Sequence, residues 1–129
     1  MENIKSYNKI YGAVGERIVT EYLQNCGYKI LEKNYKLPFG EIDIICLDNS
    51  NKTNPVYVFV EVKYRNSKQF GFPREAITKT KQATIKKVAI YYLKQKKLYE
   101  KVAMRFDCVE ILDGPSGESP EISLISNIF

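Results

Sequence analysis

The chain has 129 residues, a hydrophobic fraction of 44% and a net charge of +5, values that exclude a disordered chain and fit one globular domain spanning residues 1–129. It has no apolar run long enough to span a membrane and no apolar leader near its N-terminus, so we expect a cytoplasmic protein. The absence of histidine excludes a Ser-His-Asp triad and His-ligated zinc, and the lack of a Walker loop or GxGxxG motif argues against a nucleotide cofactor.

The first predicted element is an amphipathic helix over residues 7–26, which Gly27 ends. Its apolar stripe follows helical spacing through Ile10, Val14, Ile18 and Tyr22. Glu16 lies beside the centre of this stripe, on the side that carries Val19 and Leu23. Its ordinary interpretation is a surface acid that interacts favourably with the helix dipole.

Three strands are predicted next. Residues 28–37 form the first, and residues 40–63 contain two apolar runs joined by a polar segment, 48–55, which is typical of an antiparallel hairpin. Reflecting the hairpin about Lys52 places Asp43 opposite Glu61. On the face of these two acids the expected pairs are Ile45–Phe59 and Leu47–Tyr57, and on the other face they are Ile42–Val62, Ile44–Val60 and Cys46–Val58.

The predicted pairing of Asp43 with Glu61 creates an electrostatic conflict. Directly paired side chains lie about 5 Å apart. At that distance two carboxylates repel by roughly 3 kcal/mol at an effective dielectric constant of about 20. A hard divalent cation with oxygen ligands would relieve the repulsion. Lys63 follows Glu61 by two residues, so it should project from the same face of the strand.

A purely structural interpretation of these residues is also open. Glu61-Val62-Lys63 taken alone is an alternating strand end, and Lys63 could form a cross-strand ion pair with Glu41 worth about 0.2–1 kcal/mol. That ion pair would account for Glu41 and Lys63. It would leave Asp43 facing Glu61, so the combination of residues favours a metal site.

The longest predicted helix covers residues 74–97, with Pro73 suited to its start. Its inward side should carry Ile77, Thr84, Val88 and Tyr91, and a polar ridge at helical spacing consists of Lys79, Gln82 and Lys86. Strands at residues 104–112 and 121–125 complete the chain, with Asp107 expected to pair with Arg105. The order α-β-β-β-α-β-(β) predicts an α/β sandwich around a mixed sheet of four to five strands flanked by helices.

Positive charge is concentrated in one part of the chain. Residues 63–105 hold 13 of the 20 basic residues and only two acids, Glu75 and Glu100, whereas residues 106–129 hold five acids and no base. Such a stretch is typical of a polyanion-binding surface, although a solvated lysine-rich helix face has the same composition. Beside a metal site, nucleic acid is the favoured partner.

Asp43 followed on the next strand by Glu61-x-Lys63 resembles the PD-(D/E)XK nuclease signature. The wider pattern is similar to the YraN-like family of small bacterial proteins, which is itself similar to archaeal Holliday-junction resolvases. The matching segments, which span nearly the whole chain, are Gly12-x-x-Gly15-Glu16, Gly40-Glu41-Ile42-Asp43, Phe59-Val60-Glu61-Val62-Lys63 with Arg65, Gly71-x-Pro73, Lys79, Arg105-Phe106-Asp107 and Asn127-x-Phe129.

This resemblance implies a restriction-endonuclease-like sandwich and a Mg²⁺- or Mn²⁺-dependent endonuclease acting on DNA, with branched DNA as the substrate. Asp43, Glu61 and the backbone carbonyl of Val62 would hold the metal, Lys63 would serve the attacking water, and Glu16 would be an additional carboxylate. The expected nucleic-acid contacts are Arg65, Lys79, Gln82 and Lys86. Junction resolvases work as two-fold dimers, so the resemblance also implies a possible homodimer. The sequence itself shows no dimer face.

Two other functions remain open. A nucleic-acid-binding module with slow or no turnover predicts binding that falls with salt and no metal-dependent products. A protein-interaction domain in DNA repair or RNA metabolism, whose basic helix meets an acidic partner, predicts poor affinity for nucleic acid even at low salt.

Overall fold

The structure is a computed structural model that describes residues 2–65, 77–112 and 120–129, with the backbone alone for residues 2–13 and 65. Its elements follow the order α1 (Glu2–Asn25), β1 (Tyr28–Leu37), β2 (Gly40–Asp48), β3 (Val56–Arg65), α2 (Lys79–Gln95), β4 (Ala103–Leu112) and β5 (Glu121–Ile125). The predicted order of helices and strands is therefore confirmed. Within the described ranges, neither helix has the length and apolar character needed to cross a membrane.

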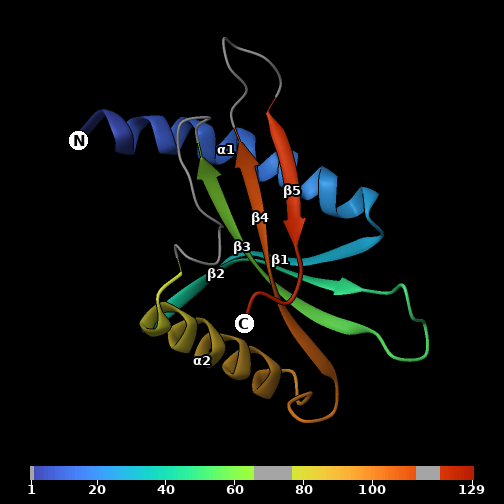
Figure 1. Cartoon of the computed structure of the whole chain (residues 1–129). Coiled ribbons are helices and arrows are strands. Elements are labelled where there is room, and N and C mark those ends of the chain that lie inside the picture. The colour runs from blue at the N-terminus through green and yellow to red at the C-terminus, as the bar shows by residue number, and fades with distance from the viewer. Residues whose placement is uncertain (1, 66–76, 113–119) are drawn as a thin grey trace.

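The five strands form one sheet in the order β1-β2-β3-β4-β5 (Figure 1). Strands β3 and β4 are parallel, and the other neighbours are antiparallel, so the sheet is mixed as predicted. A parallel neighbour requires a crossover connection, and α2 lies within this one. The α/β sandwich expected from the sequence is confirmed.

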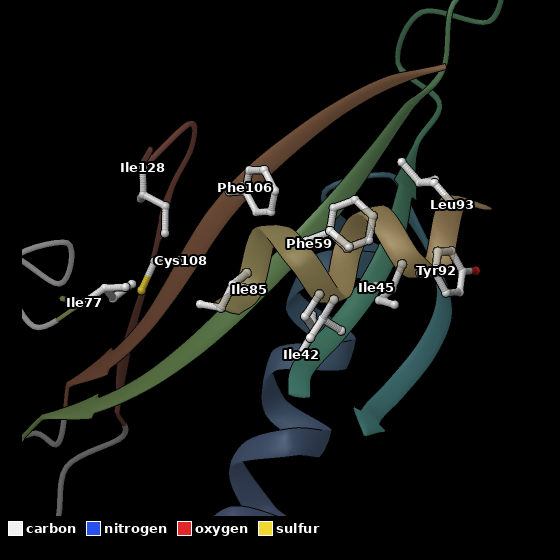
Figure 2. Close-up of a cluster of buried hydrophobic side chains, with 12 residues drawn as sticks. Ile42, Ile45, Phe59, Ile77, Ile85, Tyr92, Leu93, Phe106, Cys108 and Ile128 are labelled. Carbon is white, nitrogen blue, oxygen red and sulfur yellow. The ribbon is translucent and has the colours of Figure 1, made fainter. Parts of the chain in front are cut away.

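The two helices cover opposite faces of the sheet, and each face has its own apolar core. Helix α2 buries Ile85, Val88 and Tyr92 against a cluster that includes Ile45 and Phe59 (Figure 2). Helix α1 packs on the other face, where its contribution to the second cluster is Val19 and Leu23, packed with Ile44, Cys46, Val58, Val60, Val109 and Ile111.

The predicted register of the β2–β3 hairpin is confirmed for four pairs, which are Ile44–Val60, Ile45–Phe59, Cys46–Val58 and Leu47–Tyr57. Beyond these pairs the prediction is wrong. The described ladder ends at Ile44 and Val60, so Asp43 and Glu61 are not ladder partners. Ile42 packs on the α2 face with Ile45, whereas Val62 packs on the α1 face. The strands therefore separate at the end of the hairpin that carries the candidate site.

Both helices differ from their predicted limits. Helix α2 begins at Lys79, because the Thr78 side chain accepts a hydrogen bond from the Lys81 backbone N–H and caps the helix. Ile77 and Thr78 are described and are not helical, so the predicted start at Arg74 is wrong, and Pro73 lies outside the described residues. The inward tyrosine is Tyr92, while Tyr91 is exposed.

The buried line of α1 is displaced by one residue from the predicted stripe. Val19 and Leu23 are fully buried, whereas Val14 is 42% exposed. Glu16 shares a helix side with Val19 and Leu23. The displacement therefore turns Glu16 toward the sheet.

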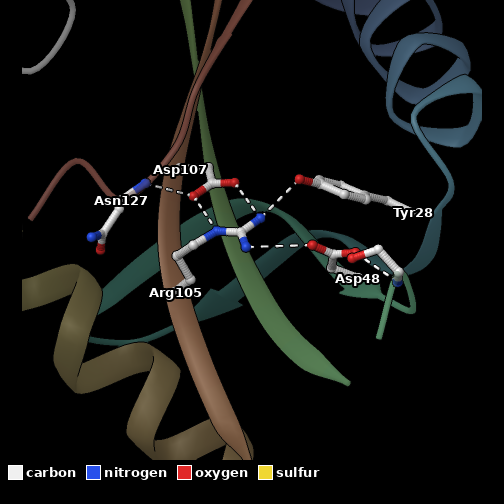
Figure 3. A network of polar contacts seen from close by, with 6 residues as sticks. Tyr28, Asp48, Arg105, Asp107 and Asn127 are labelled. Carbon is white, nitrogen blue, oxygen red and sulfur yellow. Dashed lines mark hydrogen bonds and ion pairs between the residues drawn. The ribbon is translucent and has the colours of Figure 1, made fainter. Parts of the chain in front are cut away.

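A buried ion-pair network links β4 with β1, β2 and the segment that follows β5 (Figure 3). Arg105 donates two hydrogen bonds of 2.9 Å to the carboxylate of Asp107, which is fully buried. The same guanidinium contacts the Tyr28 hydroxyl at 2.8 Å and Asp48 at 3.4 Å, and the Asn127 backbone N–H donates to Asp107. The predicted structural role of Asp107 as the partner of Arg105 is confirmed.

Replacing Asp107 with asparagine should lower the free energy of unfolding by about 3–5 kcal/mol, because Arg105 would lose the fully buried carboxylate that accepts two of its hydrogen bonds. Urea denaturation measures this loss. Glu121→Gln, which alters an exposed acid of β5, should change stability by less than about 0.5 kcal/mol. A similarly small effect of Asp107→Asn would contradict the structural role of this network.

Candidate functional site

The candidate site lies where β2 and β3 separate. The Val62 backbone N–H donates a hydrogen bond of 2.8 Å to Oδ2 of Asp43, so the carboxylate occupies the gap between the two strands. In an extended strand, the N–H and C=O of one residue point to the same side. The Val62 carbonyl oxygen therefore faces the same gap as the Asp43 carboxylate.

A slip in the alternation of β1 and β2 places Asp43 in this gap. Ile42 and Ile44 should share a face, because strand side chains repeat every two residues, yet they belong to opposite cores. In β1, Asn34 adopts a left-handed conformation with φ of 51°, between the ladder pairs Lys33–Ile44 and Tyr35–Ile42. Asparagine tolerates this conformation better than most residues. Both strands thus change face at Asn34 and Asp43.

Helix α1 lies close to the point where the two strands change face. A side chain at Gly15 would overlap the Tyr64 ring, so glycine is what allows α1 to lie against β3 at this point. The neighbouring Glu16 accepts a hydrogen bond of 3.3 Å from Asn34 and lies 3.9 Å from the Lys33 ammonium. Glu16 and Asp43 line one cavity of about 160 Å³, together with Asn34, Ile44, Val62 and Tyr64. The structure thus brings Glu16 and Asp43 to the same cavity.

On the α2 side of the gap, Glu61 is only 5% exposed. One carboxylate oxygen, Oε2, lies 3.6 Å from the Lys81 ammonium. The other, Oε1, is buried and has no hydrogen-bond partner among the residues that the structure describes. Burial, followed by the negative charge of Asp43, raises the pKa of Glu61 from its ordinary value of 4.5 to about 7. Burial likewise raises the pKa of Asp43, although the Val62 N–H and Lys81 oppose the shift.

Two lysines accompany these acids. Burial, then the hydrogen bond with Lys81 and the positive charge of that residue, lowers the pKa of Lys63. Burial alone would lower the pKa of Lys81 as well, but its hydrogen bond with Lys63 and the charges of Glu61 and Asp43 outweigh burial and raise it. Of the two ammonium groups, Lys63 therefore loses its proton more readily than Lys81.

The remaining predicted contact residues have other neighbours. Gln82 donates to the Ile77 carbonyl at 3.1 Å, and the Lys86 ammonium lies 5.6 Å from the centre of the Phe129 ring. Lys79 is exposed, and the side chain of Arg65 lies outside the described residues. Glu41, the alternative partner considered for Lys63, lies 3.9 Å from the ammonium of Lys36.

Lys81 is the site residue that the sequence analysis did not identify. It precedes Ile85, Val88 and Tyr92 at spacings of four, seven and eleven residues, so it continues the buried stripe of α2 toward the hairpin. The sequence signal that could have identified Lys81 is a charged residue in line with an apolar helical stripe. The predicted ridge through Lys79 obscured it, because that ridge lies on a neighbouring side of the helix.

The donor set fits a hard divalent cation in part. The carboxylates of Asp43 and Glu61 and the Val62 carbonyl supply oxygen donors of the kind that Mg²⁺ and Mn²⁺ prefer. Among the residues that the structure describes, no three acidic or cysteine side chains come together as a ready-made cage. Water and substrate oxygens would therefore have to supply most of the coordination shell, as is usual for Mg²⁺.

The raised pKa of Glu61 predicts a pH-dependent effect of Glu61→Gln. Between pH 4.5 and 7 the folded protein retains a proton that the unfolded chain releases, so ionisation of Glu61 lowers stability as pH rises through this window. Glutamine does not ionise. The substitution should raise the free energy of unfolding by about 1–3 kcal/mol at pH 8 and by less than about 1 kcal/mol at pH 5.

Urea denaturation at the two pH values measures this difference. Glu21→Gln, which removes an exposed carboxylate from α1, provides the control. A stability gain that is the same at both pH values, or a loss at pH 8, would show that Glu61 is not a buried acid with a raised pKa.

Comparison with known proteins places the chain in a family. The model of the uncharacterised protein family UPF0102 matches residues 15–111, a range that contains all the charged groups of the candidate site. A UPF0102 protein of Clostridium botulinum (strain Kyoto / Type A2) is 43% identical over 122 residues, which cover 95% of each chain. A UPF0102 protein of Caldicellulosiruptor saccharolyticus is 42% identical over 118 residues, 92% of this chain and 95% of its own. One from Dictyoglomus turgidum is 41% identical over 122 residues, 95% of this chain and 98% of its own. The chain therefore belongs to the UPF0102 (YraN-like) family.

Proposed function

We propose that the protein is a metal-dependent endonuclease that hydrolyses phosphodiester bonds of DNA. The observation that carries the proposal is the environment of Glu61, a carboxylate that is 5% exposed, has one orphaned oxygen and lies close enough to Asp43 for that charge to raise its pKa. Such a pair is costly unless a cation compensates it. Perturbed acids beside a cavity are typical of a functional site.

The cation in this proposal is Mg²⁺ or Mn²⁺, held by Asp43, Glu61 and the Val62 carbonyl. When bound, such an ion lowers the pKa of a coordinated water and neutralises charge on the phosphate. The hydrogen bond from the Val62 N–H fixes the orientation of the Asp43 carboxylate, so this side chain is held in position before any ligand arrives.

Lys63 is proposed as the group that receives the proton of the attacking water. Its lowered pKa increases the fraction of free amine available as a base. The water oxygen bonds to phosphorus, the bond from phosphorus to one nucleoside oxygen breaks, and the departing oxygen takes a proton from solvent. A positioned base contributes typically about 10²–10⁴-fold to such a rate.

Glu16 is proposed to orient water within the cavity that it shares with Asp43. Asn34 and Lys33 hold its carboxylate at the cavity wall, so the side chain has a defined direction. The close packing of α1 at Gly15 supports this role, because it fixes the distance of the helix from β3.

DNA is the proposed substrate because 13 of the 20 basic residues lie between positions 63 and 105. The residues proposed to contact the phosphate backbone are Lys79, Gln82 and Lys86 on α2 and Arg65 at the end of β3. Branched DNA and a two-fold homodimer are the finer proposals that the resemblance to junction resolvases supports.

A second candidate is a nucleic-acid-binding module without turnover. The observation that favours it is the ion pair between Lys81 and Glu61, which already provides a positive charge beside the acidic pair. In that case Asp43 and Glu61 stabilise a basic surface and perform no chemistry. Binding would then fall steeply with salt and would not depend on divalent metal.

Asp43→Asn and Lys63→Ala should each reduce DNA cleavage by at least about 100-fold while changing DNA affinity by less than about threefold, because they remove a metal ligand and the proposed base. The assay incubates labelled four-way junction, flap, duplex and single-stranded DNA, and RNA, with Mg²⁺, Mn²⁺ or chelator. Lys29→Ala, in an exposed lysine of β1, serves as the charge control and should cleave like the wild type. Equal cleavage by wild type and Asp43→Asn would refute the assignment, and binding without products would favour the second candidate.

A further inference from the structure

We infer that Lys81 is a built-in counter-ion that occupies the acidic site in the absence of a divalent cation and must leave Glu61 when that cation binds. The inference rests on the proposed function, because it takes Asp43 and Glu61 as the metal ligands. It assigns Lys81 a positioning role: the lysine holds Glu61 in place and sets how tightly the metal binds.

The geometry places Lys81 where a cation is needed. Its ammonium lies 3.6 Å from Oε2 of Glu61, a distance at which the two charges form an ion pair. The Asp43 carboxylate accepts a hydrogen bond from the backbone of Val62, the residue that follows Glu61, so both carboxylates lie at this point of β3. Lys81 is thus the positive centre of a cluster that contains both proposed metal-binding carboxylates.

The ion pair leaves Glu61 half satisfied. Oε2 faces Lys81, while Oε1 is buried and has no hydrogen-bond partner within residues 2–65, 77–112 and 120–129. In this part of the chain the carboxylate therefore retains an oxygen that a second positive ligand could engage. An ammonium carries one positive charge and donates hydrogen bonds, but it has no coordination shell that several oxygen ligands could fill. A divalent cation can engage carboxylate and carbonyl oxygens together. Lys81 therefore compensates only part of the negative charge of the site, and a divalent cation could replace it.

The two partners of the ion pair differ in their freedom to move. The Glu61 side chain is 6% exposed and belongs to a central strand, whereas the Lys81 side chain is 44% exposed and lies in the first turn of α2. The flexible lysine stem can carry its ammonium into solvent at little cost. Metal binding would therefore displace Lys81, while Glu61 stays in place.

Competition between Lys81 and the metal has a measurable consequence. Lys81→Met keeps a long side chain but removes the charge, so Mn²⁺ should bind about fivefold or more tightly than to the wild type, as expected when about 1 kcal/mol of competing interaction is removed. Lys81→Arg keeps the charge and should retain the wild-type affinity within about twofold. Lys87→Met removes an equal charge from the same helix, at an exposed position over the Phe39 ring, and should also leave the affinity unchanged within about twofold.

Isothermal titration calorimetry with Mn²⁺ alone, without nucleic acid, measures these affinities. Thermal unfolding with and without Mn²⁺ gives an independent readout, because Lys81→Met leaves Glu61 uncompensated and should gain more from added Mn²⁺ than the wild type does. The inference is overturned if Lys81→Met binds Mn²⁺ with unchanged or weaker affinity, if Lys81→Arg or Lys87→Met shows the same gain, or if neither wild type nor Lys81→Met binds Mn²⁺.

These outcomes are separable from those of the cleavage assay. Tighter Mn²⁺ binding by Lys81→Met, without cleavage by any variant, would support the counter-ion role and refute the endonuclease. Metal-dependent cleavage with unchanged Mn²⁺ affinity would support the endonuclease and refute the counter-ion role.

Discussion

The need of the Glu61 carboxylate for positive charge is the constraint on which the arrangement of the site depends. This side chain extends from a central strand into a region with little access to water, and a second carboxylate lies nearby. An isolated buried charge of this kind would be expelled by the fold or protonated. Here the Lys81 ammonium of α2 lies beside only one of the two carboxylate oxygens. The second oxygen destabilises the folded protein, because it has no hydrogen-bond partner among the described residues.

The position of Asp43 follows from a different constraint, the packing of one helix on each face of a bent hairpin. The change of face at Asn34 and Asp43 allows Ile42 to join the α2 core while Ile44 joins the α1 core. In a regular strand, Ile42 would share the α1 face with Ile44, and Asp43 would point into the apolar α2 core. The irregularity instead releases the Asp43 carboxylate into the gap between strands, where the Val62 N–H replaces the missing ladder partner. Strand irregularities next to functional sites are common for this reason.

Much of the fold could be predicted from the sequence, because the hairpin is nearly symmetric about its polar loop and its alternation is regular over most of its length. The register followed from that symmetry at four pairs. The slip near Asp43 could not be foreseen, since it depends on two helices that are distant in sequence, and a single asparagine is a weak signal of left-handed backbone.

The candidate site could be predicted only as a set of residue types. Asp43, Glu61 and Lys63 are predicted from their residue types and spacing, and Glu16 only from the resemblance to a nuclease family, whereas the geometry of all four depends on tertiary packing. Lys81 was not predicted because the predicted polar ridge of Lys79, Gln82 and Lys86 lies on a neighbouring side of α2, which concealed the continuity of Lys81 with the buried stripe. Thr78 is a residue type that favours the N-cap position, but a single threonine is a weak signal, and the cap uses the backbone N–H of Lys81 and not its side chain.

The charged groups of the site come from positions 16, 43, 61, 63 and 81, on two helices and two strands that are separated along the chain. Strand β3, which carries two of them, also needs β4 as its parallel neighbour, and β4 begins only at Ala103. A nascent chain emerging from the ribosome therefore cannot assemble this cluster until most of its length has been synthesised. Long-range pairing of this kind is slow to form, so ion binding at the cluster would report completion of folding more faithfully than helix content does.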